Sequence, residues 1–143
     1  MVFRIRKAKK SDLKDCAKIL FTEFKKQGEN WTRKTALARL TELLSDGGPC
    51  YCFLLDNKII GFVFCETFTY IEGKHLMISE LAIDSKYQGK GNGAKAMQFI
   101  EKIARKIKAR KIILAVNARQ KAAKIYRKLG FKPTGYEFFE KQL

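Results

Sequence analysis

The stretch LAIDSKYQGKGNGA, residues 81–94, decides how this sequence folds. It starts as the end of an apolar strand expected at Leu76–Ile83, and it opens a helix expected over Gly91–Ala109. Three glycines at alternate positions let the backbone turn sharply and approach a ligand closely. The first turn of a helix leaves amide N–H groups unpaired, and the helix dipole favours an anion there. The stretch therefore predicts a binding site for a phosphate or a pyrophosphate.

Two commoner phosphate-binding patterns do not explain this stretch. A Walker loop would end in Gly-Lys-Ser/Thr, whereas Ala94 follows Gly93 here. Gly89, Gly91 and Ala94 match the dinucleotide fingerprint in form, but a polar spacer separates them from the strand. The basic segment Lys108–Lys111 also stands where that fingerprint requires an acid. A Rossmann interpretation is therefore weak.

Apolar patterns and turn residues outline the other elements. Ser11 is expected to cap a first helix that runs to about Lys26, and Asp56-Asn57-Lys58 predicts a hairpin. The remaining expected elements are the strands Val2–Arg6, Cys50–Leu55, Ile59–Tyr70, Ile112–Val116 and Tyr136–Phe139, with helices at Thr32–Ser45 and Ala122–Leu129. This order, β-α-α-β-β-β-α-β-α-β, predicts an α/β (α+β) fold whose mixed, mainly antiparallel sheet is flanked by helices.

Length and composition limit the class of protein. The 143 residues suit a single domain spanning 1–143. No apolar run is long enough to cross a bilayer, and the start of the chain does not have the pattern of a signal peptide. Four cysteines lack a Cys-x-x-Cys spacing and His75 is the only histidine, so neither a metal site nor a disulfide framework is expected. A cytoplasmic protein with buried thiols is predicted.

The formal net charge of +16 favours anionic partners. Fifteen of the 30 Lys and Arg residues lie between Lys86 and Lys132, where Glu101 is the only acid. A nucleotide-bearing cofactor, a nucleic acid and an acidic protein surface all fit such a field. A non-catalytic, basic module that binds nucleic acid remains an alternative, although no nucleic-acid motif and no interleaved aromatic residues accompany the charge.

Two motifs in order resemble the GNAT N-acetyltransferase superfamily. Its signature, Gln/Arg-x-x-Gly-x-Gly/Ala after a strand of the form Leu-Ala-Ile/Val-Asp, is matched by residues 81–84 and 88–93. A later landmark, an apolar strand followed by a short helix and Tyr-x-Lys-Leu-Gly-Phe, is matched by Ile112–Val116 and by residues 126–131. The order of elements fits along the whole chain. The resemblance implies an acyltransferase that uses acetyl-CoA as its acetyl donor, without a metal, and often as a homodimer.

The resemblance also implies roles for the matching residues. The backbone amides of the glycine loop would hold the pyrophosphate of coenzyme A, and main-chain groups at the end of the preceding strand would pair with its pantetheine arm. Many relatives carry an asparagine where this chain has Arg119, and Asn117 is the nearby substitute. The expected cofactor-binding residues are Leu81, Ala82, Ile83, Gln88, Gly89, Lys90, Gly91, Asn92, Gly93, Ala94 and Asn117.

Acetyl transfer to an amine requires a base that removes a proton. Glu80, directly before residues 81–83 of the signature strand, is the first candidate for this base, although a carboxylate that only pairs with a neighbouring lysine or binds substrate electrostatically is an equal alternative. Tyr126 matches the family tyrosine that protonates the leaving thiolate, and simple packing is its alternative role. Glu66 and Glu72 are weaker candidates for the base. The amide of Ile83 would face the acetyl carbonyl.

The acceptor is expected to be a small-molecule amine, and protein or peptide N-acetylation is the alternative within the same enzyme class. Relatives recognise acceptors through the segment between the first two helices, where Trp31 stacks on a substrate or anchors the core. The three acids Glu66, Glu72 and Glu80 are a hypothetical acidic cleft for a cationic acceptor. His75 is expected at a strand edge, without a catalytic role.

Overall fold

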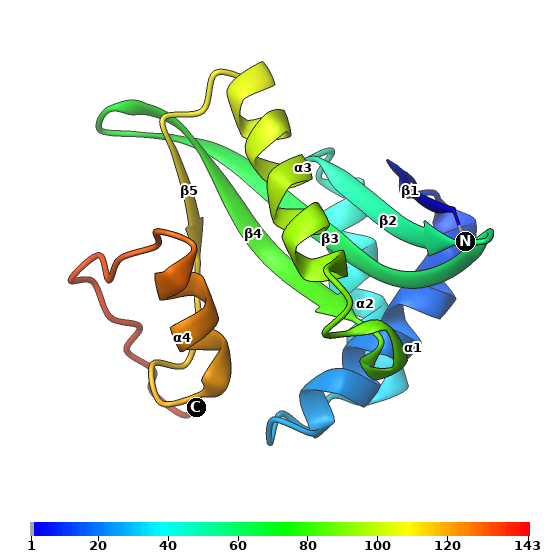
Figure 1. The fold of residues 1–143 in the computed structure, drawn as a ribbon. Helices are drawn as coiled ribbons and strands as arrows, with labels where there is room; N and C mark the ends of the chain where they lie inside the picture. The colour runs from blue at the N-terminus through cyan, green and yellow to red at the C-terminus, as the bar shows by residue number, and fades with distance from the viewer. Residues whose placement is uncertain (1) are drawn as a thin grey trace.

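A five-stranded sheet in the order β1-β2-β3-β4-β5 organises the molecule, as the computed structural model of residues 2–143 shows (Figure 1). Its strands are β1 (Phe3–Lys7), β2 (Cys50–Leu55), β3 (Lys58–Tyr70), β4 (Gly73–Ile83) and β5 (Lys111–Leu114). The first four strands pair antiparallel, and β5 runs parallel to β4. The helices are α1 (Leu13–Lys25), α2 (Arg33–Ser45), α3 (Asn92–Lys106) and α4 (Lys121–Lys128), with single 3-10 turns η1 (Lys10–Asp12) and η2 (Ser85–Tyr87). The predicted mixed, mainly antiparallel sheet with flanking helices is confirmed.

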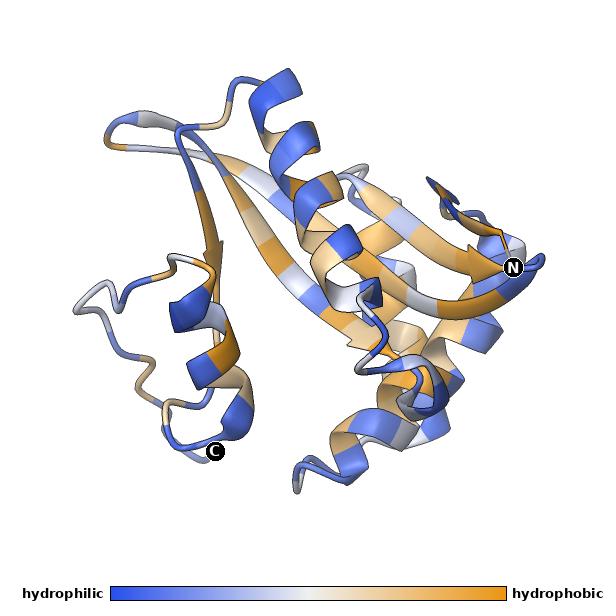
Figure 2. Ribbon diagram, viewed as in Figure 1, coloured by the Kyte–Doolittle hydropathy of each residue, from blue (hydrophilic) through white to orange (hydrophobic). Residues whose placement is uncertain are grey.

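Helices cover both faces of the sheet, and each face has its own core. On one face α1 and α2 pack through their apolar stripes against Phe62 and Phe64 of β3. On the other face α3 packs against Ile60, Val63 and Leu76. Figure 2 shows α3 with a hydrophobic side toward the sheet and a hydrophilic side outward, which is the pattern expected of a helix that lies on a sheet surface.

Two hairpins connect β2, β3 and β4. Between β2 and β3, Asp56 and Asn57 both have positive φ (50° and 68°), as a two-residue hairpin turn of type I′ requires. The β3–β4 hairpin is much longer, and its tip projects beyond the helices (Figure 1). His75 lies in this hairpin opposite Phe68 and is buried, with its ring packed against those of Phe68 and Tyr70. The prediction that His75 lies at a strand edge is wrong, because His75 pairs with β3 on one side and with Lys111 of β5 on the other.

An irregularity in β4 sets the geometry of the site. Phe64 pairs with Glu80 and Cys65 pairs with Ile78, so Ser79 is an extra residue, a β-bulge. The bulge changes the phase of the strand: Leu76 and Ile78 face α3 before it, while Glu80 and Ala82 turn toward the α1–α2 side after it. Pairing with β5 also ends at Ile78. Beyond this point β4 and β5 diverge (Figure 1).

Three details of the sequence prediction need correction. Tyr136–Phe139 is not a strand: Tyr136, Phe138 and Phe139 are 77%, 87% and 92% exposed, and no neighbouring strand supplies hydrogen bonds to this segment. The strand predicted at Ile112–Val116 is the shorter β5, which is half-buried. Ser11 does not cap α1 because it lies within η1, where the carboxylate of Asp12 accepts from the N–H of Lys9 at 2.8 Å instead.

The four cysteines are free and buried, as predicted. The Sγ atoms of Cys16 and Cys52 are 3.6 Å apart, and this hydrogen bond together with burial raises the pKa of Cys16. Burial also raises the pKa of Cys50 to about 11 and that of Cys65 to about 12. Cys16, Cys50 and Cys65 therefore stay protonated, and all four cysteines serve as core packing. None of the helices described for residues 2–143 has the length and apolar character needed to span a membrane.

Candidate functional site

The glycine loop forms an open backbone surface ahead of α3. Gly89 and Gly91 have φ of +72° and +80°, a conformation that side-chain-bearing residues adopt only with strain. A Cβ built on Gly89, Gly91 or Gly93 would meet no heavy atom within 4 Å, so the loop faces open space. Gly91 is the N-cap of α3 and has no side chain to cap the first amides. These amides therefore remain free for an anion.

The two ends of this loop are anchored differently from its middle. The Gln88 side chain donates from Nε2 to the carbonyl of Ile83 at 2.6 Å, and its backbone N–H donates to Ser85 at 3.3 Å. At the other end, the buried Asn92 donates from Nδ2 to the carbonyl of Tyr87 at 2.9 Å. The amide of Gln88 is therefore already paired, while Gly89, Lys90 and the residues that follow it present the exposed part of the loop.

The end of β4 has a free edge. Asp84 donates its N–H to Ile60 on β3 at 2.8 Å. Because backbone groups alternate sides along a strand, those of Ala82 also face β3, while those of Leu81 and Ile83 face the edge that β5 has left. This edge leads through η2 into the glycine loop, so an extended ligand arm could pair with it while its anionic end lies at α3.

Glu80 lies on the opposite side of β4 from α3, next to α2. Its Oε2 accepts from Nε of Arg39 at 3.1 Å, and its side chain is 15% exposed. Burial raises the pKa of Glu80, the Arg39 guanidinium opposes this, and the charges of Glu29 and Glu66 add to the rise. A carboxylate of this kind takes up protons closer to neutral pH than an exposed one.

The other predicted acids divide into two groups. Glu66 belongs with Glu80, because its Oε2 accepts from the bulge residue Ser79 at 2.5 Å. Glu72 lies at the β3–β4 turn, eight residues before Glu80 and roughly 26 Å along an extended strand. It pairs with Lys111 and His75, and the Lys111 contact lowers its pKa to about 2. Glu72 is therefore not placed to act with Glu80.

Trp31 and Tyr126 lie at the two sides of this region. Trp31 is half-buried against the α1–α2 core, and its Nε1 donates to Glu29 at 3.2 Å. Tyr126, on α4, packs edge-on against Phe131 with ring centroids 5.6 Å apart. Burial raises the pKa of Tyr126, so the phenol stays protonated at neutral pH and is able to donate a proton.

Asn117 caps the turn that leads into α4. Its Oδ1 accepts from the N–H of Arg119 at 3.0 Å, and its carbonyl accepts from Gln120. Gln120 in turn donates from Nε2 to the carbonyl of Gln27, after α1, at 3.0 Å. The turn before α4 is thus tied to the end of α1.

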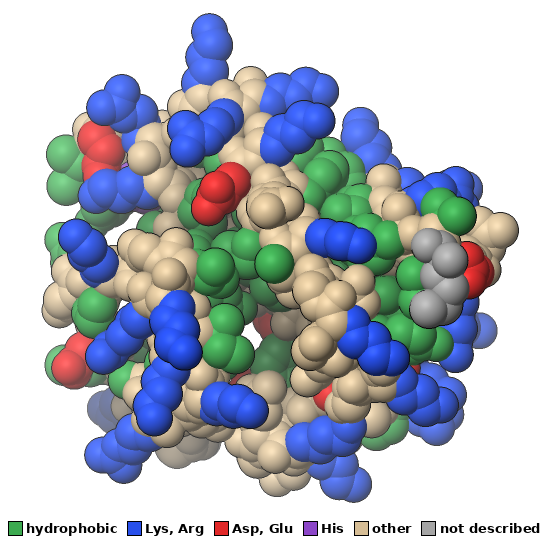
Figure 3. Space-filling model, viewed as in Figure 1, with side chains coloured by type: hydrophobic (Ala, Val, Ile, Leu, Met, Phe, Trp, Pro, Cys, Tyr) green, Lys and Arg blue, Asp and Glu red, His purple; other side chains and the backbone are tan. Residues whose placement is uncertain are grey.

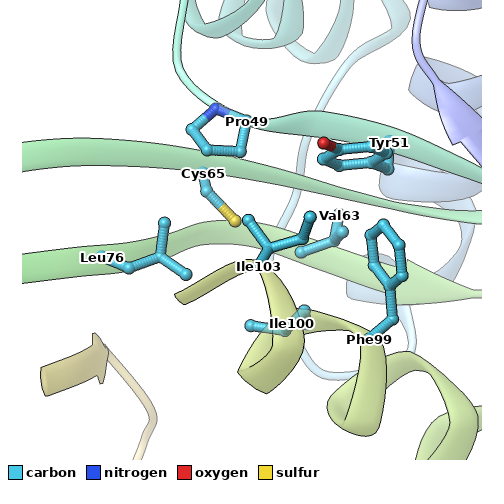
Figure 4. A pocket seen from close by; sticks show the side chains of 8 residues that line it. All are labelled: Pro49, Tyr51, Val63, Cys65, Leu76, Phe99, Ile100 and Ile103. Atoms are coloured by element: carbon cyan, nitrogen blue, oxygen red, sulfur yellow. The ribbon is translucent and has the colours of Figure 1, made fainter. Parts of the chain in front are cut away.

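The surface is hollowed between α4 and the loop ahead of α3, with Lys and Arg side chains around the hollow (Figure 3). A separate small cavity of about 10 Å³ lies between α3 and the sheet, lined entirely by apolar and aromatic side chains including Cys65, Leu76 and Phe99 (Figure 4). It offers at most the space of one water and no polar partner for it. This second cavity is therefore a packing gap.

Three residues of this region were not found from the sequence. Arg39 comes from α2, Ser79 from the bulge, and Glu23 from α1, where it accepts hydrogen bonds from Ser85. Of the three, only Glu23 could have been noticed in the sequence. It falls in phase with the apolar stripe of its helix, where a charged residue is unusual. Within residues 2–143, no group of three His, Cys, Asp or Glu side chains is arranged to hold a metal.

Comparisons with known proteins agree with this geometry. The model of the acetyltransferase (GNAT) family matches residues 13–131. No match was found among proteins of curated function. A possible acetyltransferase from Clostridium difficile 630 superposes with a TM-score of 0.86 at 21% identity, covering 100% of this chain and 99% of its own.

Two further solved structures share the fold. A predicted acetyltransferase from Clostridium acetobutylicum, solved with acetyl-CoA, has a TM-score of 0.78 at 17% identity and covers 99% and 96% of the two chains. Glucosamine-6-phosphate N-acetyltransferase from Arabidopsis thaliana has a TM-score of 0.70 at 22% identity and covers 99% of both chains. With the family match over most of its length, this chain belongs to the GNAT family, and it is an acyltransferase that takes its acetyl group from acetyl-CoA.

Proposed function

We propose that this enzyme acetylates a primary amine of a small molecule by direct attack of the amine on acetyl-CoA. The observation that carries the proposal is the course of β4. The free edge of β4 at Leu81 and Ile83 leads into the exposed glycine loop. Glu80 lies between the bulge and Leu81 on the same strand. One strand thus offers a surface for the donor and a base for the acceptor.

The donor would bind along this edge. The free amides from Gly89 to Ala94 would hold the pyrophosphate, with the charge of Lys90 beside them. The main-chain groups of Leu81 would pair with the pantetheine arm and Ala82 would face β3, while the Ile83 carbonyl already accepts from Gln88 and its N–H is left for the acetyl end of the donor. Asn117, at the start of α4, would approach from the other side of the hollow. When bound, acetyl-CoA supplies the activated acetyl group.

Glu80 and Tyr126 would carry out the proton transfers. Glu80 would accept the proton of the acceptor ammonium, directly or through a water, so that a neutral nitrogen attacks the thioester carbon. The N–H of Ile83 would donate to the carbonyl oxygen as negative charge develops there. As the carbon–sulfur bond breaks, Tyr126 would give its proton to the sulfur, and the extra proton that the attacking nitrogen still carries would pass through water to the Tyr126 phenolate. Glu80 would release its proton to solvent, so that the neutral amide, the coenzyme A thiol and the starting forms of both side chains result. The raised pKa of Glu80 makes its carboxylate a stronger base, and the raised pKa of Tyr126 keeps its phenol protonated before the thiolate leaves.

The surroundings of Glu80 support a small amine as acceptor. Glu29 and Glu66 carry negative charge close to Glu80, whereas the whole chain has a net charge of +16. An amine would therefore find locally favourable charge. Trp31, held by Glu29, lies two residues before the start of α2 and would offer an aromatic face to the acceptor. The Arabidopsis relative, of similar length, acetylates by its name a small amino sugar phosphate.

Calorimetry with acetyl-CoA and a Gly91→Glu variant tests the donor site. The added carboxylate would lie in the loop and repel pyrophosphate, so the wild type is expected to bind and the variant is not. Thiol release would then be followed with amino sugars and polyamines on one side and lysine-containing peptides on the other. Turnover of peptides alone would replace the small-molecule proposal by peptide acetylation, and a folded wild type that binds no acetyl-CoA would refute the donor site.

A further inference from the structure

A buried carboxylate from α1 reaches the turn that precedes the glycine loop. Glu23 is 8% exposed, and it lies 62 residues before its main partner in the sequence. Its Oε2 accepts from the backbone N–H of Ser85 at 3.1 Å, and its Oε1 accepts from the Ser85 hydroxyl at 2.5 Å. Oε1 also lies 3.4 Å from Nε2 of Gln88. A single side chain therefore holds both ends of the turn.

A lysine completes this arrangement. Nζ of Lys26 lies 3.4 Å from Oε2 of Glu23 and donates to the hydroxyl of Ser85 at 2.5 Å. Four donors thus surround one carboxylate, which offsets the cost of burying its charge. Shifting the turn relative to α1 would break several of these contacts together. The contacts made by Glu23 therefore fix where the turn lies.

The same contacts decide which groups the loop offers to a ligand. Gln88, held between Glu23 and the carbonyl of Ile83, joins the turn to the free edge of β4. The N–H of Ser85 is taken by Glu23. The exposed amides are then those from Gly89 onward, held at a set distance from the Ile83 edge.

We propose that Glu23 is a positioning residue that preorganises the pyrophosphate loop against the end of β4. This inference rests on the proposed donor site. Without Glu23 the turn must become ordered when the donor binds, and affinity for coenzyme A falls by that ordering cost. The acceptor side and the proton transfers do not involve Glu23, so the loss appears in donor binding.

Calorimetry with coenzyme A on Glu23→Ala and Glu23→Asp tests the proposal. Aspartate keeps the charge but is too short to reach Ser85, so both variants are expected to bind about tenfold more weakly or worse. The matched control is Asp12→Asn, which removes the other buried carboxylate at the opposite end of α1, where it binds Arg6. This control should lose stability while its dissociation constant for coenzyme A stays within about twofold of the wild type.

Steady-state kinetics separate positioning from general damage. The KM for acetyl-CoA should rise in the Glu23 variants, while kcat at saturating acetyl-CoA and the KM for the amine stay close to wild type. Equal affinity in wild type and Glu23→Asp, or an equal loss in Asp12→Asn, would overturn the proposal while leaving the donor site intact. A folded wild type without affinity for coenzyme A would overturn both.

Discussion

The ion pair between Arg39 and Glu80 lets the proposed base be tested by its pKa. Burial raises the pKa of Glu80, and the hydrogen bond from Arg39 lowers it. An Arg39→Met variant removes only the lowering contribution, so the pKa of Glu80 should rise further. The acidic limb of the pH profile of kcat/KM should then move to higher pH.

Glu80→Gln is the companion variant for this profile. It should lower kcat by about a hundredfold or more, the usual contribution of a general base, and abolish the acidic limb. A limb that stays at the same pH in Arg39→Met would show that another group titrates. A limb that persists in Glu80→Gln would have the same meaning.

The ion pair between Asp12 and Arg6 predicts how the stability of the fold depends on pH. Its carboxylate binds both terminal nitrogens of Arg6, at 2.8 and 3.0 Å, and this contact holds its pKa below the ordinary value. A carboxylate with a lowered pKa stabilises the fold above its unfolded-state pKa and loses that contribution as pH falls through the folded-state value. The free energy of unfolding of the wild type should exceed that of Asp12→Asn by about 2 kcal/mol at neutral pH.

The pH dependence distinguishes this ion pair from a simple packing effect. The difference in unfolding free energy between wild type and Asp12→Asn should be constant above about pH 5 and shrink below about pH 4. Chemical denaturation at a series of pH values measures it. A difference that does not change with pH would mean that Asp12 acts through shape alone.

At the scale of elements, the start of α3 offers two glycines with opposite expected effects. Gly91 has φ of +80°, so Gly91→Ala should destabilise the fold by about 1–2 kcal/mol through backbone strain. Gly93 lies in the first turn of the helix with no positive φ, and an added Cβ meets nothing within 4 Å. Gly93→Ala should therefore stabilise by about 0.5–1 kcal/mol.

Thermal and denaturant unfolding of the two variants measures this pair. Because the change in side chain is the same and the two positions are neighbours, their difference isolates backbone conformation. Equal destabilisation by both variants would contradict the open space at Gly93, since the methyl group added there is expected to meet no atom and to cause no backbone strain.

The sequence predicted most elements because their signals are local. The glycine loop, the Asp56-Asn57 turn and the apolar stripes each follow from a few adjacent residues, and all three lie where they were expected. The bulge at Ser79 was missed because it depends on how two strands pair, and the residues around it have no regular alternation of apolar and polar side chains that a bulge would interrupt. The last strand was wrongly predicted for a related reason: aromatic residues favour strands, but Tyr136–Phe139 has no neighbour to pair with.

The candidate site was predictable in part for the same reason. The loop residues follow from spacing, and the resemblance supplied roles for Glu80 and Tyr126 that remain predictions. Arg39 and Glu23 reach the site from other helices, and nothing in their local sequence states which strand or loop they contact. Contacts across 41 and 62 residues are set by the fold as a whole.

At the scale of the whole molecule, the charge is unbalanced. The chain has 30 Lys and Arg against 14 Asp and Glu, and Figure 3 shows blue side chains spread over the visible face. Among the Lys and Arg residues of the described part of the chain, only Arg6, Lys26, Arg39 and Lys111 take part in ion pairs. Most of the positive charge therefore repels itself in the folded state, where it is closest together.

This repulsion predicts that salt stabilises the protein. Raising NaCl from about 20 mM to about 300 mM shortens the screening length from roughly 20 Å to roughly 6 Å, so the melting temperature should rise by several degrees. A matched variant replaces three exposed lysines of α1 and α2 that have no ion pair in the described part of the chain, Lys14, Lys18 and Lys34, by glutamine. It should melt higher than the wild type at low salt and respond less to salt. A wild type that melts at the same temperature in both salts would show that its charges are too far apart to matter, and the positive field would then act only on ligands.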